Sequence, residues 1–308
     1  MLTIETMLAN SLVVVTGASR GIGRAIAVAI AEEVGAPSRQ NDNSSLATIS
    51  SPLHVVLIAR SHEKLQETAN LVEKRCGGLV TTSCHEIDMS DLETLEDKLH
   101  CILEPLSEQK YDSCVLVNNH GSVEPLGFAS DLTSMKELQE SINLNVTSCI
   151  WMSSQFTKMF MKNASSSNNK TPLVRIVNIS SICALDPFPT MSIYCAGKAG
   201  RDMFHNVLAK EDSSKSDENN NDGSESDGGS IIEKQRYKVL NYAPGPCDTE
   251  MTDVLSNCPV LDDELQNYFK TAKLENKLVR PEETAKKLVG ILTEDDFESG
   301  THIDYYDV

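Results

Sequence analysis

The stretch "VVVTGASRGIGRA", residues 13–25, joins a β-rich apolar run to three closely spaced glycines. Gly17, Gly21 and Gly23 follow the run and stand where a helical pattern begins. Glycines let the backbone turn tightly and approach a pyrophosphate, to which a helix N-terminus offers free N–H groups. One glycine-rich match can also be a plain tight turn. Its position between a strand and a helix favours a dinucleotide-binding site.

Further β-rich runs alternate with helical patterns along the rest of the chain. The runs occupy residues 54–60, 79–88, 113–119, 173–181, 237–245 and 300–306, and helical spacing is clear at 23–34, 61–75 and 92–103. Near-continuous apolar strands that alternate with helices indicate a parallel sheet covered on both faces. The sequence therefore predicts an α/β fold, a single-domain Rossmann-type doubly wound parallel sheet with helices on both faces.

Three polar stretches interrupt this pattern and read as low-complexity insert loops. They lie at 37–52, 164–171 and 211–230, and all three are rich in Ser, Asn or Asp and poor in large apolar residues. Such segments bury too little apolar surface to offset the entropy of ordering. No internal repeat or second domain is visible, so we expect residues 1–308 to form one domain that carries these loops.

Composition excludes several classes of function. The net charge of −18 argues against a nucleic-acid partner, and no apolar run approaches the ~20 residues that span a bilayer. Nine cysteines without a Cys-x-x-Cys pair suit a reducing compartment, and the N-terminus has no basic leader. His205 and His302 lack a ligand cluster at metal spacing. We therefore expect a cytoplasmic protein without a metal, a membrane partner or a nucleic-acid partner.

The end of the second predicted strand indicates which dinucleotide binds. An acid there accepts from the ribose hydroxyls of NAD, whereas an arginine accommodates the 2′-phosphate of NADP. This strand ends at "LIAR", with Arg60 in that place, and Arg20 of the glycine loop can close on the same phosphate. The alternative is that Arg60 only caps an exposed strand end. Two guanidiniums and no acid favour NADP(H).

Tyr194 and Lys198 stand four residues apart in "SIYCAGKAGRDMF", residues 192–204. Residues at this spacing share a helix face, although such a pair also arises by chance. Other pieces occur in order, namely Thr16-Gly17-x3-Gly21-x-Gly23, Asp88, "NNHG" (118–121), Asn145 in "LNVTS", "NISS" (178–181) and "PG" (244–245). With these pieces the chain resembles the short-chain dehydrogenase/reductase family over nearly its whole length.

The resemblance implies roles for individual residues of this chain. The implied catalytic residues are Asn145, Ser181, Tyr194 and Lys198. The implied cofactor-binding residues are Gly17, Ser19, Arg20, Gly21, Ile22, Gly23, Arg60, Ser61, Asp88, Met89, Asn118, Lys198, Cys247, Asp248, Thr249, Glu250 and Met251. The chain departs from the family at His120, where a small residue is usual, and in the longer gap between the glycine loop and Arg60.

These residue types suit the reduction of a ketone, which needs a hydride and a proton. A free tyrosine has a pKa of about 10, and a neighbouring cation favours the phenolate and lowers that value. We therefore expect Lys198, together with the positive nicotinamide, to lower the pKa of Tyr194. Ser181 donates to the carbonyl oxygen as charge grows there. By resemblance, Asn145 holds a water that links Lys198 to solvent.

Within the family the chain is most similar to the reductases of pterin side-chain carbonyls, through "NISSICALDPFP" (178–189), "LNYAPGPCDTEM" (240–251) and "SGTHIDYYD" (299–307). The similarity implies sepiapterin and 6-pyruvoyl-tetrahydropterin as substrates, in the synthesis of tetrahydrobiopterin. Asp304 would then accept the paired N–H donors of the amino-pyrimidine edge. The implied substrate-binding residues are Ser181, Ile182, Tyr194, Gly245 and Asp304.

Three alternatives remain at this point. Many family members end a strand with Val-Asp-Gly-Gly, whose acid does not bind substrate, so Asp304 can be structural. The chain can also be another short-chain reductase of small ketones or diketones, or an NADP-binding protein without catalysis.

The resemblance further implies a homodimer through the helices near Ser141 and Ser192. Candidate apolar residues for that interface are Trp151, Met152, Met159, Met203 and Phe204.

Overall fold

The computed structural model describes residues 10–35, 53–76, 78–162, 172–218 and 237–308. Its centre is a seven-stranded sheet in the order β3-β2-β1-β4-β5-β6-β7, and every neighbouring pair is parallel. The strands are β1 (Ser11–Thr16), β2 (Leu53–Ala59), β3 (Val80–Glu86), β4 (Ser113–Asn118), β5 (Leu173–Ile179), β6 (Tyr237–Ala243) and β7 (Thr301–Asp304). The predicted doubly wound parallel fold is confirmed.

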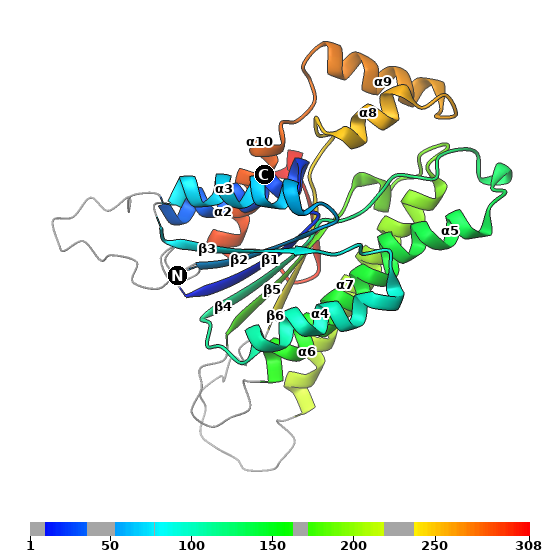
Figure 1. Ribbon diagram of the computed structural model, residues 1–308. Helices are drawn as coiled ribbons and strands as arrows, with labels where there is room; N and C mark the ends of the chain where they lie inside the picture. Colours follow the sequence, from blue (N-terminus) through cyan, green and yellow to red (C-terminus); the bar gives the residue numbers. More distant parts are fainter. Residues whose placement is uncertain (1–9, 36–52, 77, 163–171, 219–236) are drawn as a thin grey trace.

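Helices cover both faces of this sheet (Figure 1). One face carries α2 (Gly21–Gly35), α3 (His62–Cys76) and α10 (Pro281–Glu294), and the other carries α4 (Leu92–Ser107), α5 (Met135–Ile142), α6 (Ser148–Lys162) and α7 (Ser192–Glu218). The helices α8 (Glu250–Asn257) and α9 (Asp263–Leu274) pack on each other outside the two layers. Short helical turns occupy Ala129–Asp131, Asn143–Thr147, Ile182–Ala184 and Tyr305–Asp307.

The strand order reverses direction at β1, and this reversal positions the site. The chain moves outward from β1 to β3, then returns to place β4 on the other side of β1. In such sheets a crevice opens at the carboxyl ends of the strands beside the reversal. The glycine loop after β1 and the "NNHG" segment at the end of β4 therefore lie side by side at that crevice, in direct contact.

The apolar strands form one core layer on each side of the sheet. Alternate residues of β1 point to opposite faces, so Val13 and Val15 pack with α2 and α10, whereas Leu12 and Val14 pack beneath α4 and α6. All four side chains are fully buried. Burial on both faces explains why the strand reads as a continuous apolar run.

The predicted inserts fall mainly outside the described residues. The stretches at 37–52 and 164–171 lie there completely, as does most of 211–230. The part that is described, Glu211 to Glu218, continues the helix α7. Asp212 is buried, and its carboxylate accepts a hydrogen bond from the backbone N–H of Tyr237. The acidic stretch thus begins inside a packed helix.

Candidate active site

The glycine loop leaves β1 at Thr16 and enters α2 with room only for glycine. Gly17 and Gly21 adopt φ angles of +64° and +52°, a region that side chains rarely tolerate. A Cβ on Gly23 would lie 2.3 Å from the carbonyl oxygen of Gly17. Asn119 clamps the loop by donating to the carbonyls of Thr16 and Gly17, both at 3.2 Å. The backbone at the start of α2 is therefore open to a phosphate group.

A cleft of about 1220 Å³ runs along this loop. The predicted cofactor residues that line it are Gly17, Ser19, Arg20, Gly21, Ile22, Arg60, Ser61, Met89, Asp248, Thr249, Glu250 and Met251. The glycine cradle and this lining fit a dinucleotide. Five predicted residues, Gly23, Asp88, Asn118, Lys198 and Cys247, do not line the cleft.

Two of these five show why they turn away. Asn118 is fully buried, and its amide nitrogen donates to the Ser153 hydroxyl at 2.7 Å, so the next residue, Asn119, faces the cleft instead. Asp88 accepts from the backbone and the hydroxyl of Ser90 at 2.9 and 2.7 Å. Burial raises the pKa of Asp88, but the Ser90 hydrogen bonds and the Arg60 charge outweigh burial and lower it.

Both basic and acidic residues line the cleft; the basic ones include Arg20, Arg60 and Lys64, and the acidic ones include Asp248 and Glu250. Arg60 is exposed at the end of β2, and among the described residues no carboxylate forms an ion pair with it. Arg20 is paired with Glu250 of α8, and Lys64 Nζ lies 3.8 Å from the same carboxylate. Glu250 thus links the glycine loop to α8.

Ser181, Tyr194 and Lys198 meet where β5 ends and α7 begins. Ser181 caps the short turn at Ile182–Ala184, and its hydroxyl accepts from the backbone N–H of Cys183 at 3.2 Å. The same hydroxyl lies close enough to Tyr194 to act on the pKa of its phenol, which it lowers. Lys198 Nζ lies 5.5 Å from the centre of the Tyr194 ring and donates to the Ile179 carbonyl oxygen at 2.6 Å. The sequence spacing therefore assembles the expected trio.

The electrostatics of this trio differ from the expectation. Burial raises the pKa of the Tyr194 phenol above its usual value, and the Ser181 hydroxyl and the Arg201 charge only partly oppose that effect. Burial and Arg201 also lower the pKa of Lys198 to about 7. The buried surroundings disfavour both the Tyr194 phenolate and the Lys198 ammonium ion. In the protein alone, Lys198 therefore does not lower the pKa of Tyr194 enough to ionise the phenol.

Asn145 lies in a π-helical turn between α5 and α6, at Asn143–Thr147. Its side-chain oxygen accepts from the Ser122 N–H at 3.0 Å, and its side-chain nitrogen donates to the Ser122 carbonyl and to Ser141 Oγ. The side chain therefore holds the loop that follows "NNHG". Wide helical turns of this kind occur frequently at functional sites.

His120 fills the position where a small residue was expected. Its ring is buried between two hydroxyls, with Nδ1 2.8 Å from Thr16 Oγ1 and Nε2 2.9 Å from Ser148 Oγ. Burial, aided by Arg201 and Lys198, lowers the pKa of His120 well below its usual value. The neutral ring thus ties the glycine loop to α6.

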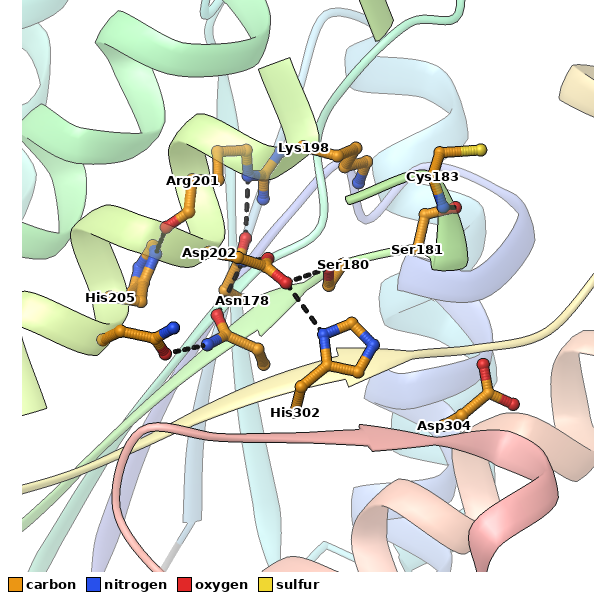
Figure 2. A network of polar contacts seen from close by, with 12 residues as sticks. Asn178, Ser180, Ser181, Cys183, Lys198, Arg201, Asp202, His205, His302 and Asp304 are labelled. Carbon is orange, nitrogen blue, oxygen red and sulfur yellow. Dashed lines mark hydrogen bonds and ion pairs between the residues drawn. The ribbon is translucent and has the colours of Figure 1, made fainter. Parts of the chain in front are cut away.

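One of the predicted substrate residues, Tyr194, belongs to a buried apolar cluster. This cluster includes Val123, Cys183, Met191, Tyr194, Leu255 and Leu261. Ile182 is exposed next to it, and Asp304 ends β7 with Oδ1 accepting from the Tyr306 N–H at 3.0 Å. Gly245 has a φ of +74°, and a Cβ there would approach Val279 at 3.2 Å. Figure 2 shows Ser181 just beyond β5 and Asp304 at the end of β7, and β6 lies between these two strands in the sheet.

Comparison with known proteins identifies the family. The family profile described as short chain dehydrogenase matches residues 11–216, which include the glycine loop and the Ser181–Tyr194–Lys198 trio. The chain belongs to the short-chain dehydrogenase family.

Among the described residues no helix is long and apolar enough to cross a membrane, and no group of three acidic, histidine or cysteine side chains is placed to hold a metal.

Relatives within the family extend over almost the whole chain. The chain is 31% identical over 298 residues to sepiapterin reductase of Rattus norvegicus, which covers 96% of each chain, and 32% identical over 305 residues to that of Bos taurus, which covers 97% and 96%. It is 29% identical to a benzil reductase of Bacillus subtilis, with 91% and 93% covered. Each of these proteins is named as a reductase.

Solved structures of the family share the fold. An NAD⁺-bound xylitol dehydrogenase superposes with a TM-score of 0.70 at 16% identity, over 97% of this chain and 98% of that one. A short-chain dehydrogenase from Mycobacterium marinum superposes with a TM-score of 0.67 at 19% identity, over 97% and 95%. At these identities the likeness establishes only the fold of the chain. The identity of its cofactor has to be argued from the residues that line its own cleft.

Proposed function

We propose that the protein is a cytoplasmic, NADPH-dependent reductase of pterin side-chain carbonyls, acting on sepiapterin and 6-pyruvoyl-tetrahydropterin in tetrahydrobiopterin biosynthesis. The observation that carries the proposal is similarity to sepiapterin reductases over 96% of the chain, together with the Ser181–Tyr194–Lys198 trio. Sequence similarity supports the proposed substrate class, and the arrangement of the three side chains supports the proposed reaction.

The proposed division of labour follows the geometry. When bound in the cleft, the nicotinamide supplies the hydride that reduces the carbonyl carbon. The Tyr194 phenol, whose pKa burial raises, holds the proton that the carbonyl oxygen needs. Ser181, which lies close to Tyr194, donates to the same oxygen as its charge develops. The net change adds one hydride and one proton and converts C=O into CH–OH.

The proposed preference for NADPH rests on two arginines that line the cleft. A 2′-phosphate carries more negative charge than a ribose hydroxyl and suits a guanidinium fork. Arg60 is exposed at the end of β2, and Arg20 belongs to the glycine loop after β1. Glu250 accepts from Arg20 in the protein alone, so a bound phosphate would compete with that carboxylate.

A second candidate function is the reduction of small diketones, which the benzil reductase relative favours. The apolar side chains packed around Tyr194 would favour such substrates, which need no polar anchor. NADPH oxidation measured with sepiapterin, with benzil and with a panel of simple ketones separates the two. Turnover of benzil but not of sepiapterin would reject the pterin assignment, and no turnover of any carbonyl would reject the enzyme.

A further inference from the structure

The carboxylate of Asp202, on α7, connects three segments of the site (Figure 2). Its Oδ1 accepts from Asn178 Nδ2 of β5 at 2.8 Å, and its Oδ2 accepts from Ser180 Oγ and from His302 Nδ1 of β7, both at 2.8 Å. Ser180 is the residue directly before Ser181. One acidic side chain thus joins α7 to the end of β5 and to β7.

The same region buries two cations. Lys198 and Arg201 are 5% and 0% exposed. The guanidinium of Arg201 donates to the carbonyl oxygens of Asn118 and His120 and to Asn178 Oδ1, at 2.7 to 2.9 Å, and all three acceptors are neutral. Buried charges are costly unless they are compensated. The compensation for this pair must come from a nearby anion.

Asp202 is the carboxylate placed to compensate them. Among the described residues the buried carboxylates are Asp202 and Asp212. Asp212 stands fourteen residues beyond Lys198 on α7, about 21 Å away by helical rise. Asp202 stands one turn beyond Lys198, and its partner Asn178 also accepts from Arg201.

We propose that Asp202 is a positioning residue of the reductase, whose negative charge holds Lys198 as an ammonium ion and whose hydrogen bonds fix the Ser180–Ser181 segment against α7. The proposal rests on the catalytic roles proposed for Ser181, Tyr194 and Lys198. The Lys198 ammonium donates to the carbonyl of Ile179, which directly precedes Ser180. Asp202 therefore acts on both ends of that contact.

The groups that face Lys198 support this role. Burial and Arg201 lower its pKa, while Asp202, Cys149 and Cys183 raise it. Burial raises the pKa of both thiols, that of Cys183 to about 11, so neither is an anion near neutral pH. The other facing groups, Tyr194 and His120, are neutral for the same reason. Asp202 is the anion that remains.

The direct test is the titration of Lys198 followed by NMR in protein labelled with ¹³C at the lysine Cε, its signal assigned with Lys198→Met. Asp202→Asn removes the charge but keeps the size of the side chain. We expect it to lower the pKa of Lys198 by about one unit or more. Ser180→Ala is the matched control, because it removes one hydrogen bond to Asp202 and no charge. It should leave the titration where it is in the unaltered protein.

Activity gives a second readout. In single-turnover reduction with saturating NADPH, the alkaline decline of the rate should move to lower pH in Asp202→Asn and stay in place in Ser180→Ala. A loss that is uniform across pH, with an unmoved Lys198 titration, would show that Asp202 is only structural and would overturn the proposal. The NMR titration needs neither substrate nor turnover, so failure of the proposed function remains distinguishable from failure of this inference.

A further variant covers the case in which Asp202→Asn does not fold. His302→Leu removes one hydrogen bond to Asp202 and leaves the carboxylate charged. The pKa of Lys198 should then stay level or rise, because the anion has lost a competing donor. A fall of one unit or more in this variant would mean that the hydrogen bonds, rather than the charge, control Lys198, and the proposal would be wrong.

Discussion

The Lys198 ammonium nitrogen lies 2.6 Å from the backbone carbonyl oxygen of Ile179, in the strand that ends just before Ser181. The lysine is therefore anchored to the main chain of β5 while it lies 5.5 Å from the centre of the Tyr194 ring. This contact fixes α7 against the strand end that carries Ser181. It also keeps a charged group in a site where burial lowers its pKa to about 7.

Replacing Lys198 with methionine should abolish reduction and stabilise the fold. A pKa that falls from 10.5 to about 7 means that folding disfavours the proton. The cost is absent above pH 10.5, grows as pH falls, and is complete below about pH 7. It amounts to at most about 5 kcal/mol, and the unsatisfied Ile179 carbonyl offsets about 1–3 kcal/mol of the gain.

Thermal melts at pH 6.5 and 9.5 measure this effect. The rise in Tm for Lys198→Met should be larger at pH 6.5 than at pH 9.5. Lys136→Met is the control, because Lys136 is exposed on α5 and should show no such difference. A larger rise at pH 9.5 would contradict the depressed pKa of Lys198.

Replacing Tyr194 with phenylalanine should remove the proton donor alone. The ring remains to pack in the apolar cluster with Cys183 and Met191. General acid catalysis contributes about 10²–10⁴-fold, so kcat should fall by at least that range while the Kd for NADPH changes little. Stopped-flow reduction and cofactor fluorescence measure the two quantities. Retention of most of kcat would assign the proton to another group.

Replacing Arg60 with aspartate should turn the cofactor preference toward NADH. An acid repels the 2′-phosphate and accepts from ribose hydroxyls, and each charge-assisted contact contributes about 1.5–3 kcal/mol. The ratio of kcat/KM for NADPH to that for NADH should fall by about ten- to hundredfold or more. Arg60→Ala is the matched control. It should lower kcat/KM for NADPH without raising kcat/KM for NADH. An unchanged ratio in both variants would leave Arg60 as a strand cap.

The fold and the trio were readable from sequence because local patterns encode them. Strands such as Val13–Val15 are buried on both faces, so an apolar run suffices to find them. The sequence did not predict which side chain at a strand end points into the cleft, because a shift of one position turns the side chain to the opposite side of the sheet. Asn119, rather than Asn118, therefore lines the cleft.

The polar network beneath the trio was also hidden from the sequence. No motif in the sequence singles out Arg201 or Asp202. They are buried because α7 packs against β5 and the "NNHG" segment. There Asn178 donates to Asp202, and the His120 carbonyl accepts from Arg201. Only tertiary contacts bring Asn178, His302 and the helix together, and no spacing in the chain encodes that meeting.

The exposed apolar residues of α7 indicate where two copies should meet. Met203 is 64% exposed and Val207, one turn later, is 47% exposed, whereas Met152 of the predicted interface is buried in the core. Met203→Glu should therefore weaken a homodimer through α7, as judged by sedimentation velocity at micromolar concentration. Leu274→Glu, on the exposed face of α9, is the control and should sediment as the unaltered protein does. An unaltered protein that sediments as a monomer would refute the interface.

The assignment of a pterin substrate depends most on Asp304. This residue ends β7, and its main chain is held by a reciprocal capping arrangement with Asp307, whose Oδ2 accepts from the Asp304 N–H at 3.1 Å. Lys287 of α10 donates to the Tyr305 carbonyl at 2.8 Å and fixes the same turn. The Asp304 carboxylate forms the other half of this arrangement by accepting from the Tyr306 N–H at 3.0 Å, so a test of Asp304 must separate substrate binding from support of the turn.

Asp304→Ala should raise KM for sepiapterin by about 30- to 150-fold, the loss expected when a charge-assisted pair worth about 2–3 kcal/mol is removed. Reduction of benzil, which lacks an amino-pyrimidine edge, should change little, because the trio is untouched. Asp307→Ala is the matched control, since it breaks the other half of the capping arrangement and leaves the Asp304 carboxylate in place. An equal loss on both substrates in Asp304→Ala, matched by Asp307→Ala, would mean that Asp304 supports only the C-terminal turn.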